Sequence, residues 1–275
     1  DDYYWDDRWC VLALEAAAGL LADAGDTLPA HGYAQAARDL RGVIDRSLAS
    51  ARARLGRAAM PAAPYRRMDA GAVGNLCAAH PLQLFAADDP RLADTVEYLL
   101  AHHLVDGGFF QDMIHSGINA YLTLHLAQAL LRAGDARHAA LIERVAELAT
   151  PTGQWPEAIH PRTGGGCMGD GHHGWAAAEW VLMMRNLLVR EEGAALILAS
   201  GVPAAWLHGD TRTRVQRLRN RCGEISLSID GDPTSPRVRW DTRWHTPPAS
   251  VTIEAPGYAP ERIASARGEC RLRPA

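Results

Sequence analysis

Residues 119–133, NAYLTLHLAQALLRA, have the pattern of a single helix that ends before Gly134. Apolar side chains recur there at helical spacing, and glycine favours the end of a helix. Six other stretches show a similar pattern: 7–24, 30–55, 70–85, 89–103, 136–149 and 175–190. Helices of similar length joined by loops of uneven length are typical of a helical toroid, in which each hairpin buries one face on its neighbours. We therefore expect a mainly α protein with about seven helices.

The pattern changes near Gly193. Four short stretches after it alternate or are β-branched, and they lie between clusters of Gly, Pro and Asp: 195–199, 224–230, 237–240 and 249–255. Such segments predict a small antiparallel β unit. We expect a helical region over 1–193 and a β region over 194–275. Because seven helices leave a ring open on one side, we also expect a missing N-terminal portion or a partner chain to complete it.

Composition argues against several classes of protein. The 275 residues are 48% hydrophobic and 22% charged, which is typical of globular proteins. A formal net charge of −4 gives no basic field for nucleic acid or anionic lipid, and no apolar run is long enough to cross a bilayer. Five scattered cysteines without a C-x-x-C spacing favour neither a disulfide framework nor a zinc knuckle. All 28 basic residues are arginine, which indicates a GC-rich bacterial genome; the compartment, cytoplasmic or exported, stays open.

The first nine residues, DDYYWDDRW, place four carboxylates and four aromatic rings at the start of a helix. Acids suit a helix N-terminus because the exposed N–H groups and the helix dipole favour negative charge. One interpretation is therefore helix capping with a Trp5–Trp9 pair. The other is a sugar-binding cleft, in which rings such as Tyr4 and Trp5 stack on the apolar faces of pyranoses while acids bind hydroxyls. Arg8 then either steers a neighbouring aspartate or braces the start of the helix.

A second unusual stretch is 154–175, QWPEAIHPRTGGGCMGDGHHGW, which lies between two predicted helices. A connection this long is seldom mere linkage in a compact domain. Its three histidines, cysteine and aspartate offer metal ligands, but their spacing matches no zinc pattern. Gly164, Gly166 and Gly169 satisfy G-x-G-x-x-G, yet no βαβ unit surrounds them as a nucleotide site requires. In a third interpretation Glu157 is one half of an acid/base pair whose partner lies in the first helix.

The two motifs together resemble those of the six-hairpin (α/α)6-barrel glycosidases, a superfamily that includes glucoamylases, trehalases and processing α-glucosidases. The similarity lies in WDDRW at 5–9, PEAIHPRTGGG at 156–166 and GWAAAEW at 174–180. It implies the C-terminal part of an (α/α)6-type barrel over 1–193 and a β-sandwich-like accessory region over 194–275. It also implies Asp6 as the general acid, with Asp7 as the alternative, and Glu157 as the general base.

The resemblance implies an inverting hydrolase that cleaves the O-glycosidic bonds of an oligo- or polysaccharide without a metal or other cofactor. In that mechanism the acid protonates the glycosidic oxygen while the base deprotonates a water on the opposite face of the sugar. Two alternatives stay open: a glycoside phosphorylase on the same fold, and a carbohydrate-binding protein without catalysis. A polysaccharide lyase that uses Tyr4, His115 and Arg67 is a further alternative.

Other side chains of these motifs, and one in the loop before residue 119, are expected to contact the substrate. The expected substrate-binding residues are Tyr4, Trp5, Arg8, His115, Trp155, His160, His172, His173 and Trp175. Structural roles are the alternative for some of them. His115 is then an ordinary structural histidine, His172 and His173 brace Glu157, and Trp175 packs in the core.

Overall fold

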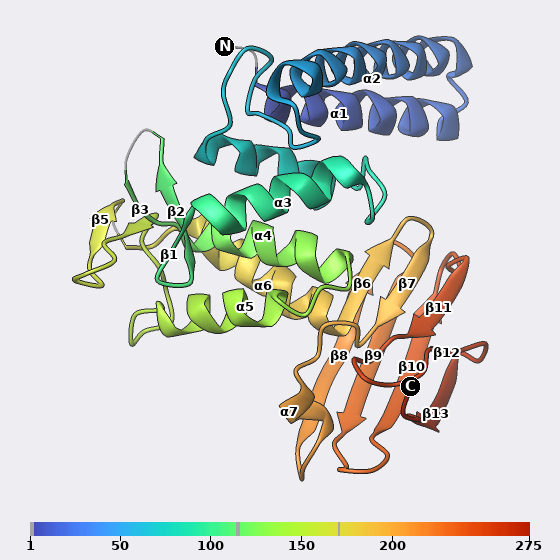
Figure 1. The fold of residues 1–275 in the computed structure, drawn as a ribbon. Coiled ribbons are helices and arrows are strands. Elements are labelled where there is room, and N and C mark those ends of the chain that lie inside the picture. The colour runs from blue at the N-terminus through green and yellow to red at the C-terminus, as the bar shows by residue number, and fades with distance from the viewer. Residues whose placement is uncertain (1–2, 114–115, 170) are drawn as a thin grey trace. The chain divides into compact units, whose positions relative to one another are not determined.

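The computed structural model describes residues 3–113, 116–169 and 171–275 (Figure 1). The chain divides into two compact units, Asp1–Glu179 and Trp180–Ala275. Helix α6 (Gly174–Leu188) runs across this division, and the first strand of the second unit begins at Val189, ahead of the boundary predicted at 194. None of the helices in the described ranges is both long and apolar enough to cross a membrane.

The first unit consists mainly of helices that pair in chain order. They are α1 (Tyr4–Asp23), α2 (Thr27–Leu55), the 3-10 helix η1 (Ala70–Ala78), α3 (Pro90–His102), α4 (Ala120–Arg132), α5 (His138–Glu147) and the start of α6. Figure 1 shows α1 packed along α2, and further contacts join η1 to α3 and α4 to α5. Helix η1 also contacts α1 and α4, so it lies between them. Each of the seven predicted stretches contains a helix, but the third is a 3-10 helix that ends at Ala78 rather than near residue 85. Among the described residues, an eighth helix that was not predicted, α7 (Ala204–Leu207), lies in the second unit.

Local sequence signals account for the ends of these helices. Asn119 caps α4, because its Oδ1 accepts a hydrogen bond from the Leu122 N–H at 2.9 Å. Asp89 likewise accepts from the Arg91 N–H at 2.9 Å, one residue after the proline that opens α3. Gly56 ends α2 with a φ of 69°, a left-handed conformation that glycine adopts without steric cost.

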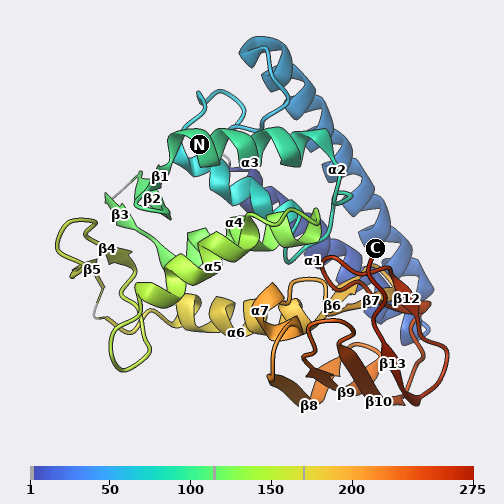
Figure 2. The ribbon, with the colours of Figure 1, turned by 60° about the horizontal axis from the view of Figure 1, so that its bottom comes forward.

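Short strands between the helices form a five-stranded sheet at one end of α4 and α5 (Figure 2). In spatial order they are β1 (Leu104–Val105), β2 (Gly108–Asp112), β3 (Ser116–Ile118), β4 (Ala158–Ile159) and β5 (Gly166–Met168). Strand β3 leads into α4, and its Ile118 pairs with Ile159 of β4. The sheet therefore ties the start of α4 to the loop that precedes α6. Glycine is needed for this approach, because a Cβ on Gly117 would lie 2.9 Å from that of Ala158.

The second unit is a β-sandwich with one short helix. Its elements are β6 (Val189–Glu192), β7 (Ala195–Leu198), α7 (Ala204–Leu207), β8 (Arg212–Asn220), β9 (Gly223–Asp230), β10 (Arg237–Trp244), β11 (Ser250–Ile253), β12 (Glu261–Arg262) and β13 (Arg267–Arg271). One sheet has the order β13-β10-β9-β8 and the other β12-β11-β7-β6. Strands β7 and β11 pair in parallel, and the other neighbours are antiparallel. Buried aliphatic side chains of both sheets form one core, among them Leu196, Ile225 and Val251.

The prediction of a mainly α protein with one small β unit is wrong. Helices make up 42% and strands 23% of the structure, and the described residues form three sheets, so the fold is mixed α and β. The strands β1–β5 have only two to five residues, too few for a period-two pattern to stand out. Strand β8, RTRVQRLRN, carries exposed arginines and a bulge, which hide its alternation.

Candidate functional site

Four aromatic side chains from three helices form what we call the aromatic platform: Trp5, Trp9, Tyr121 and Trp175. The imidazole of His125 joins them into one line of contacts. Trp5 and Trp9 of α1 are 5.9 Å apart between ring centroids, and Trp5 lies 5.9 Å from the imidazole of His125 in α4. His125 is 4.4 Å from Tyr121, which in turn is 5.3 Å from Trp175 of α6. Trp175 is 63% exposed and Trp9 38%, so the platform reaches solvent.

The carboxylates of the two sequence motifs differ in their exposure. Asp6 follows Trp5 in the first turn of α1 and is exposed, whereas Asp7 is half-buried. Glu157 is half-buried directly before β4. Burial lowers the pKa of His173, and the negative charge of Glu157 acts in the opposite direction. The His173 ring lies 6.4 Å from the ring of Tyr121 and 6.2 Å from that of Trp175, between centroids.

Glycines shape the loop that carries Glu157. A Cβ on Gly166 would lie 3.0 Å from the Cβ of Pro156, so only glycine lets β5 lie this close. Gly169 has a φ of 74° and lies beside Glu157, with 3.6 Å between the Cβ of Glu157 and the position that a Cβ on Gly169 would take. Gly169 therefore lies against Glu157 in the part of the loop that precedes α6.

Three residues expected at the substrate lie in the core instead. Tyr4 is 1% exposed and its hydroxyl is 2.6 Å from the Ser47 hydroxyl of α2. Trp155 is 4% exposed and donates its indole N–H to the Val145 carbonyl at 2.8 Å. Arg8 is 1% exposed. Since these side chains have partners in the core, we assign Tyr4, Arg8 and Trp155 structural roles and no longer propose them as substrate contacts.

The predicted histidines have different positions. His160 is exposed, and its Nδ1 accepts the Arg162 N–H at 3.2 Å, so this imidazole stabilises a turn. His172 is exposed and its Nε2 lies 3.4 Å from the side-chain nitrogen of Gln154. His173 lies beside the platform, near Tyr121 and Trp175. His115 lies outside the described residues.

A buried polar cluster lies behind the platform, in residues that the sequence did not single out. Glu179 of α6 is 5% exposed, and its Oε1 accepts a hydrogen bond from the Gln128 amide at 2.8 Å. The same oxygen lies 3.3 Å from Nε2 of His80, and Oε2 lies 3.8 Å from Nε2 of His125. We call Glu179, Gln128, His80 and His125 the Glu179 cluster. It joins the segment after η1 to α4 and α6.

Burial and hydrogen bonding set the charges of this cluster. Burial lowers the pKa of His125 to about 4, so its imidazole is neutral at pH 7. Burial by itself raises the pKa of Glu179, but the contact with His80 and the other neighbours reverse this, and the net pKa lies below its usual value. The cluster therefore holds an ionised carboxylate next to a neutral imidazole.

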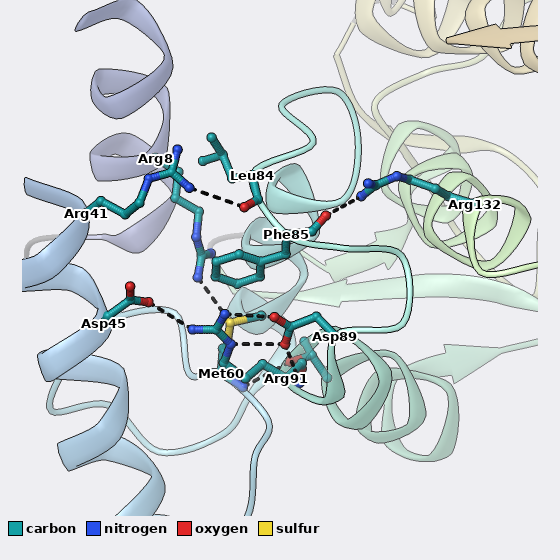
Figure 3. Close-up of polar contacts among 10 residues, drawn as sticks. Arg8, Arg41, Asp45, Met60, Leu84, Phe85, Asp89, Arg91 and Arg132 are labelled. Carbon is teal, nitrogen blue, oxygen red and sulfur yellow. Dashed lines mark hydrogen bonds and ion pairs between the residues drawn. The ribbon is translucent and has the colours of Figure 1, made fainter. Parts of the chain in front are cut away.

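Four arginines from four helices fix the loop that follows His80 (Figure 3). Arg132 of α4 donates to the carbonyls of Ala79 and Phe85, at 3.1 and 2.8 Å. Arg41 of α2 donates to the Leu84 carbonyl at 3.3 Å. The Phe85 ring is within 5.3 Å of the guanidinium of Arg8 and 3.8 Å of that of Arg91, so it is flanked by two cations. We call this arrangement the arginine clamp.

Arg8 is the buried member of the clamp. Its guanidinium donates to the side-chain oxygen of Asn75 and, at 3.1 Å, to the sulfur of Met60. Within the described part of the chain, no carboxylate lies at ion-pair distance from it. Burial accordingly lowers the pKa of Arg8, although the nearby Cys77 thiol opposes this. Arg8 thus anchors the start of α1, which carries Asp6, onto η1.

Exposed rings beside carboxylates can stack on a pyranose while carboxylates accept its hydroxyl protons. Over the described ranges, no three His, Cys, Asp or Glu side chains are grouped to hold a metal ion.

Comparison with known proteins gave similarity to solved structures only. The chain is similar over part of its fold to structures described as glycosidases, with 21% identity over 62% of this chain. The TM-score is 0.42 for a variant and 0.40 for a wild-type glycosidase. The match covers 45% of those chains, less than half of their length. No protein-family model matches the sequence, and no curated protein matches it either.

Proposed function

We propose that this chain hydrolyses O-glycosidic bonds of an oligo- or polysaccharide with inversion of configuration. Asp6 is the general acid, with Asp7 as the alternative, and Glu157 is the general base. Trp5, Trp9, Tyr121 and Trp175 form the surface on which the sugar stacks, with His173 beside Glu157.

The observation that carries this proposal is the line of ring contacts between the two carboxylate motifs. Trp5, next to Asp6, is linked to His173, next to Glu157, by ring-to-ring steps of 5.9, 4.4 and 6.4 Å through His125 and Tyr121. Residues far apart in sequence thus belong to one group of neighbouring side chains. The exposure of Trp9 and Trp175 leaves part of this group free to bind a ligand.

The chemistry assigns a separate task to each group. The acid gives its proton to the glycosidic oxygen as the bond to the anomeric carbon breaks. The base removes a proton from a water that attacks the opposite face of that carbon, which requires a carboxyl separation of roughly 6.5–9.5 Å. Glu157 is half-buried, which limits the solvent around it, whereas Asp6 is exposed.

The test is the release of reducing ends from a panel of neutral and acidic oligosaccharides by the full chain. Asp6→Asn and Glu157→Gln are each expected to lower kcat by about 10²–10⁴-fold, since general acid–base catalysis contributes that much. Asp7→Asn decides between the two acids, and Asp23→Asn, an exposed carboxylate of the same helix, is the matched control. Full activity of both Asp6→Asn and Asp7→Asn, or of Glu157→Gln, would refute the assignment.

Cleavage that depends on added inorganic phosphate would indicate a phosphorylase. Binding of an oligosaccharide without turnover would indicate a carbohydrate-binding protein.

A further inference from the structure

We propose that Glu179 and His80 form a carboxylate–imidazole dyad that presents His80 as a hydrogen-bond acceptor to a hydroxyl of the bound sugar. His80 is then a specificity-determining residue and Glu179 a positioning residue. The identity of the ligand as a sugar rests on the function proposed above, whereas the dyad itself rests on the geometry of the Glu179 cluster.

The dyad is held from several sides. Glu179 Oε1, which faces His80 Nε2 at 3.3 Å, is fixed by the Gln128 amide at 2.8 Å. Its other oxygen faces His125 at 3.8 Å. Glu179, Gln128 and His125 are 5%, 2% and 2% exposed, so water does not compete for the carboxylate. A buried carboxylate with these partners has a fixed orientation, and its Oε1 faces the buried Nε2 of His80 at 3.3 Å.

The charges in the cluster decide the tautomer of His80. Ionised Glu179 can only accept hydrogen bonds, so it favours the tautomer of His80 in which the facing nitrogen, Nε2, carries the proton. In a neutral imidazole the other ring nitrogen, Nδ1, is then an acceptor. A sugar hydroxyl, which donates one hydrogen, is a complementary partner for this nitrogen.

His80 is also the member of the cluster best placed to meet a ligand. Its side chain is 15% exposed, while the carboxylate that orients it is almost fully buried. Its ring lies edge-on to His125 at 6.3 Å, and His125 packs between Trp5 and Tyr121 of the platform. The backbone beside His80 is fixed by the arginine clamp and by the His80 N–H, which donates to the Leu76 carbonyl at 3.0 Å. His80 therefore approaches the platform from a rigid support.

A purely structural role for the cluster makes different predictions. A network that only joins helices contributes to folding stability. A substitution in it then changes sugar affinity no more than a substitution elsewhere that destabilises the fold equally. A dyad requires that Glu179 act through His80. Removing either residue then costs the same binding energy, and removing both costs little more.

The experiment measures oligosaccharide binding by quenching of tryptophan fluorescence, for wild type, Glu179→Gln, His80→Gln and the double variant. Glu143→Gln, an exposed glutamate of α5, is the matched control. Each single variant is expected to raise Kd about tenfold, the double variant no more than about twofold further, and the control not at all. Imidazole ¹⁵N NMR of wild type is expected to show His80 protonated at Nε2, and Glu179→Gln to allow both tautomers.

The outcomes separate the dyad from the hydrolase. Unchanged Kd in Glu179→Gln, additive effects in the double variant, or a wild-type His80 protonated at Nδ1 would overturn the dyad. Binding without cleavage would refute the proposed hydrolase activity. The Kd values of the variants would then still decide whether the dyad exists. A chain that neither binds nor cleaves any oligosaccharide of the panel overturns both. If Glu179→Gln fails to fold, the Kd of His80→Gln and the wild-type tautomer decide.

Discussion

At the scale of single residues, Trp175 combines large exposure with ordered contacts. It is 63% exposed yet lies 5.3 Å from Tyr121 and 6.2 Å from His173, both between ring centroids. An indole held open to solvent in this way is a ready stacking surface, because its orientation is set before a ligand arrives.

Trp175→Ala is therefore expected to weaken oligosaccharide binding roughly tenfold, the loss of about 1.4 kcal/mol of stacking. The free energy of unfolding should change by less than about 0.5 kcal/mol, since an exposed ring contributes little to the core. Isothermal titration and urea unfolding measure the two quantities. Val181→Ala, 66% exposed on the same helix, is the control. Equal affinity of Trp175→Ala and wild type would remove this ring from the site.

The motifs of the candidate site were visible in the sequence, but the Glu179 cluster was not. WDDRW and the 154–175 stretch stand out because acids, rings and glycines are concentrated in a few residues. His125, Gln128 and Glu179 instead lie singly within apolar helices, where each resembles an ordinary core residue. Gln128 and Glu179 bond across 51 residues of sequence, so their meeting depends on tertiary packing that no local pattern records.

At the scale of elements, the loop after His80 owes its order to the arginine clamp. The Phe85 ring is the part of the loop that both Arg8 and Arg91 contact. Since cation–π contacts contribute more when they are shielded from water, this ring should be the main anchor.

Phe85→Leu is expected to destabilise the chain by about 1–2 kcal/mol, from lost cation–π contact and lost volume. It should also raise amide hydrogen exchange in the loop that follows His80. Urea unfolding and exchange measured by mass spectrometry check both effects. Tyr65→Leu replaces a ring that is 95% exposed and should change neither. An unaltered exchange rate in Phe85→Leu would mean that the clamp does not order the loop.

In the second unit, the start of β9 depends on glycine. Gly223 has a φ of 145°, and a Cβ there would overlap the carbonyl oxygen of Arg243 and lie 2.9 Å from the Cα of Trp244. Gly223→Ala is expected to destabilise the sandwich by about 3 kcal/mol or more, because backbone must move. Gly257→Ala, where φ is 83° and an added Cβ meets no described atom within 4 Å, should cost only about 1 kcal/mol. Thermal unfolding followed by circular dichroism compares them, and equal losses would contradict this account.

Elements differed in how far they could be predicted. Helix positions followed from apolar periodicity and from glycines that end a helix, such as Gly134, which act locally. Strands β7, β9, β10 and β11 were predicted because their residues alternate or are β-branched between turn signals. Strands β1–β5 are too short to show such a pattern, and the exposed arginines of β8 hide it. Pairing partners such as β7 and β11, which are distant in sequence and parallel, are settled by packing of the two sheets.

At the scale of the whole molecule, the buried charges make stability depend on pH. His125 binds a proton near pH 6.5 when unfolded but only near pH 4 when folded. Between these values the unfolded state binds more protons, so stability falls as pH falls. The pKa of Glu179 is lowered in the folded state, so protonation of this carboxylate reduces the free energy of unfolding further at still lower pH.

Between pH 7 and pH 5, protonation of His125 in the unfolded state is expected to lower the free energy of unfolding by about 2 kcal/mol. Urea unfolding at the two pH values measures it, and His125→Gln should remove most of this part of the dependence. His31→Gln, at an exposed histidine, should leave it in place. A His125→Gln variant with the wild-type pH dependence would show that another group is responsible.

The central claim is that two carboxylates beside one aromatic platform hydrolyse a glycosidic bond with inversion. The most direct test is ¹H NMR of the first-formed sugar anomer during cleavage by the full chain, before mutarotation. Our account predicts the anomer opposite in configuration to the substrate, and at least about a hundredfold slower release by Glu157→Gln. A product of retained configuration, or an undiminished rate in Glu157→Gln, would contradict it.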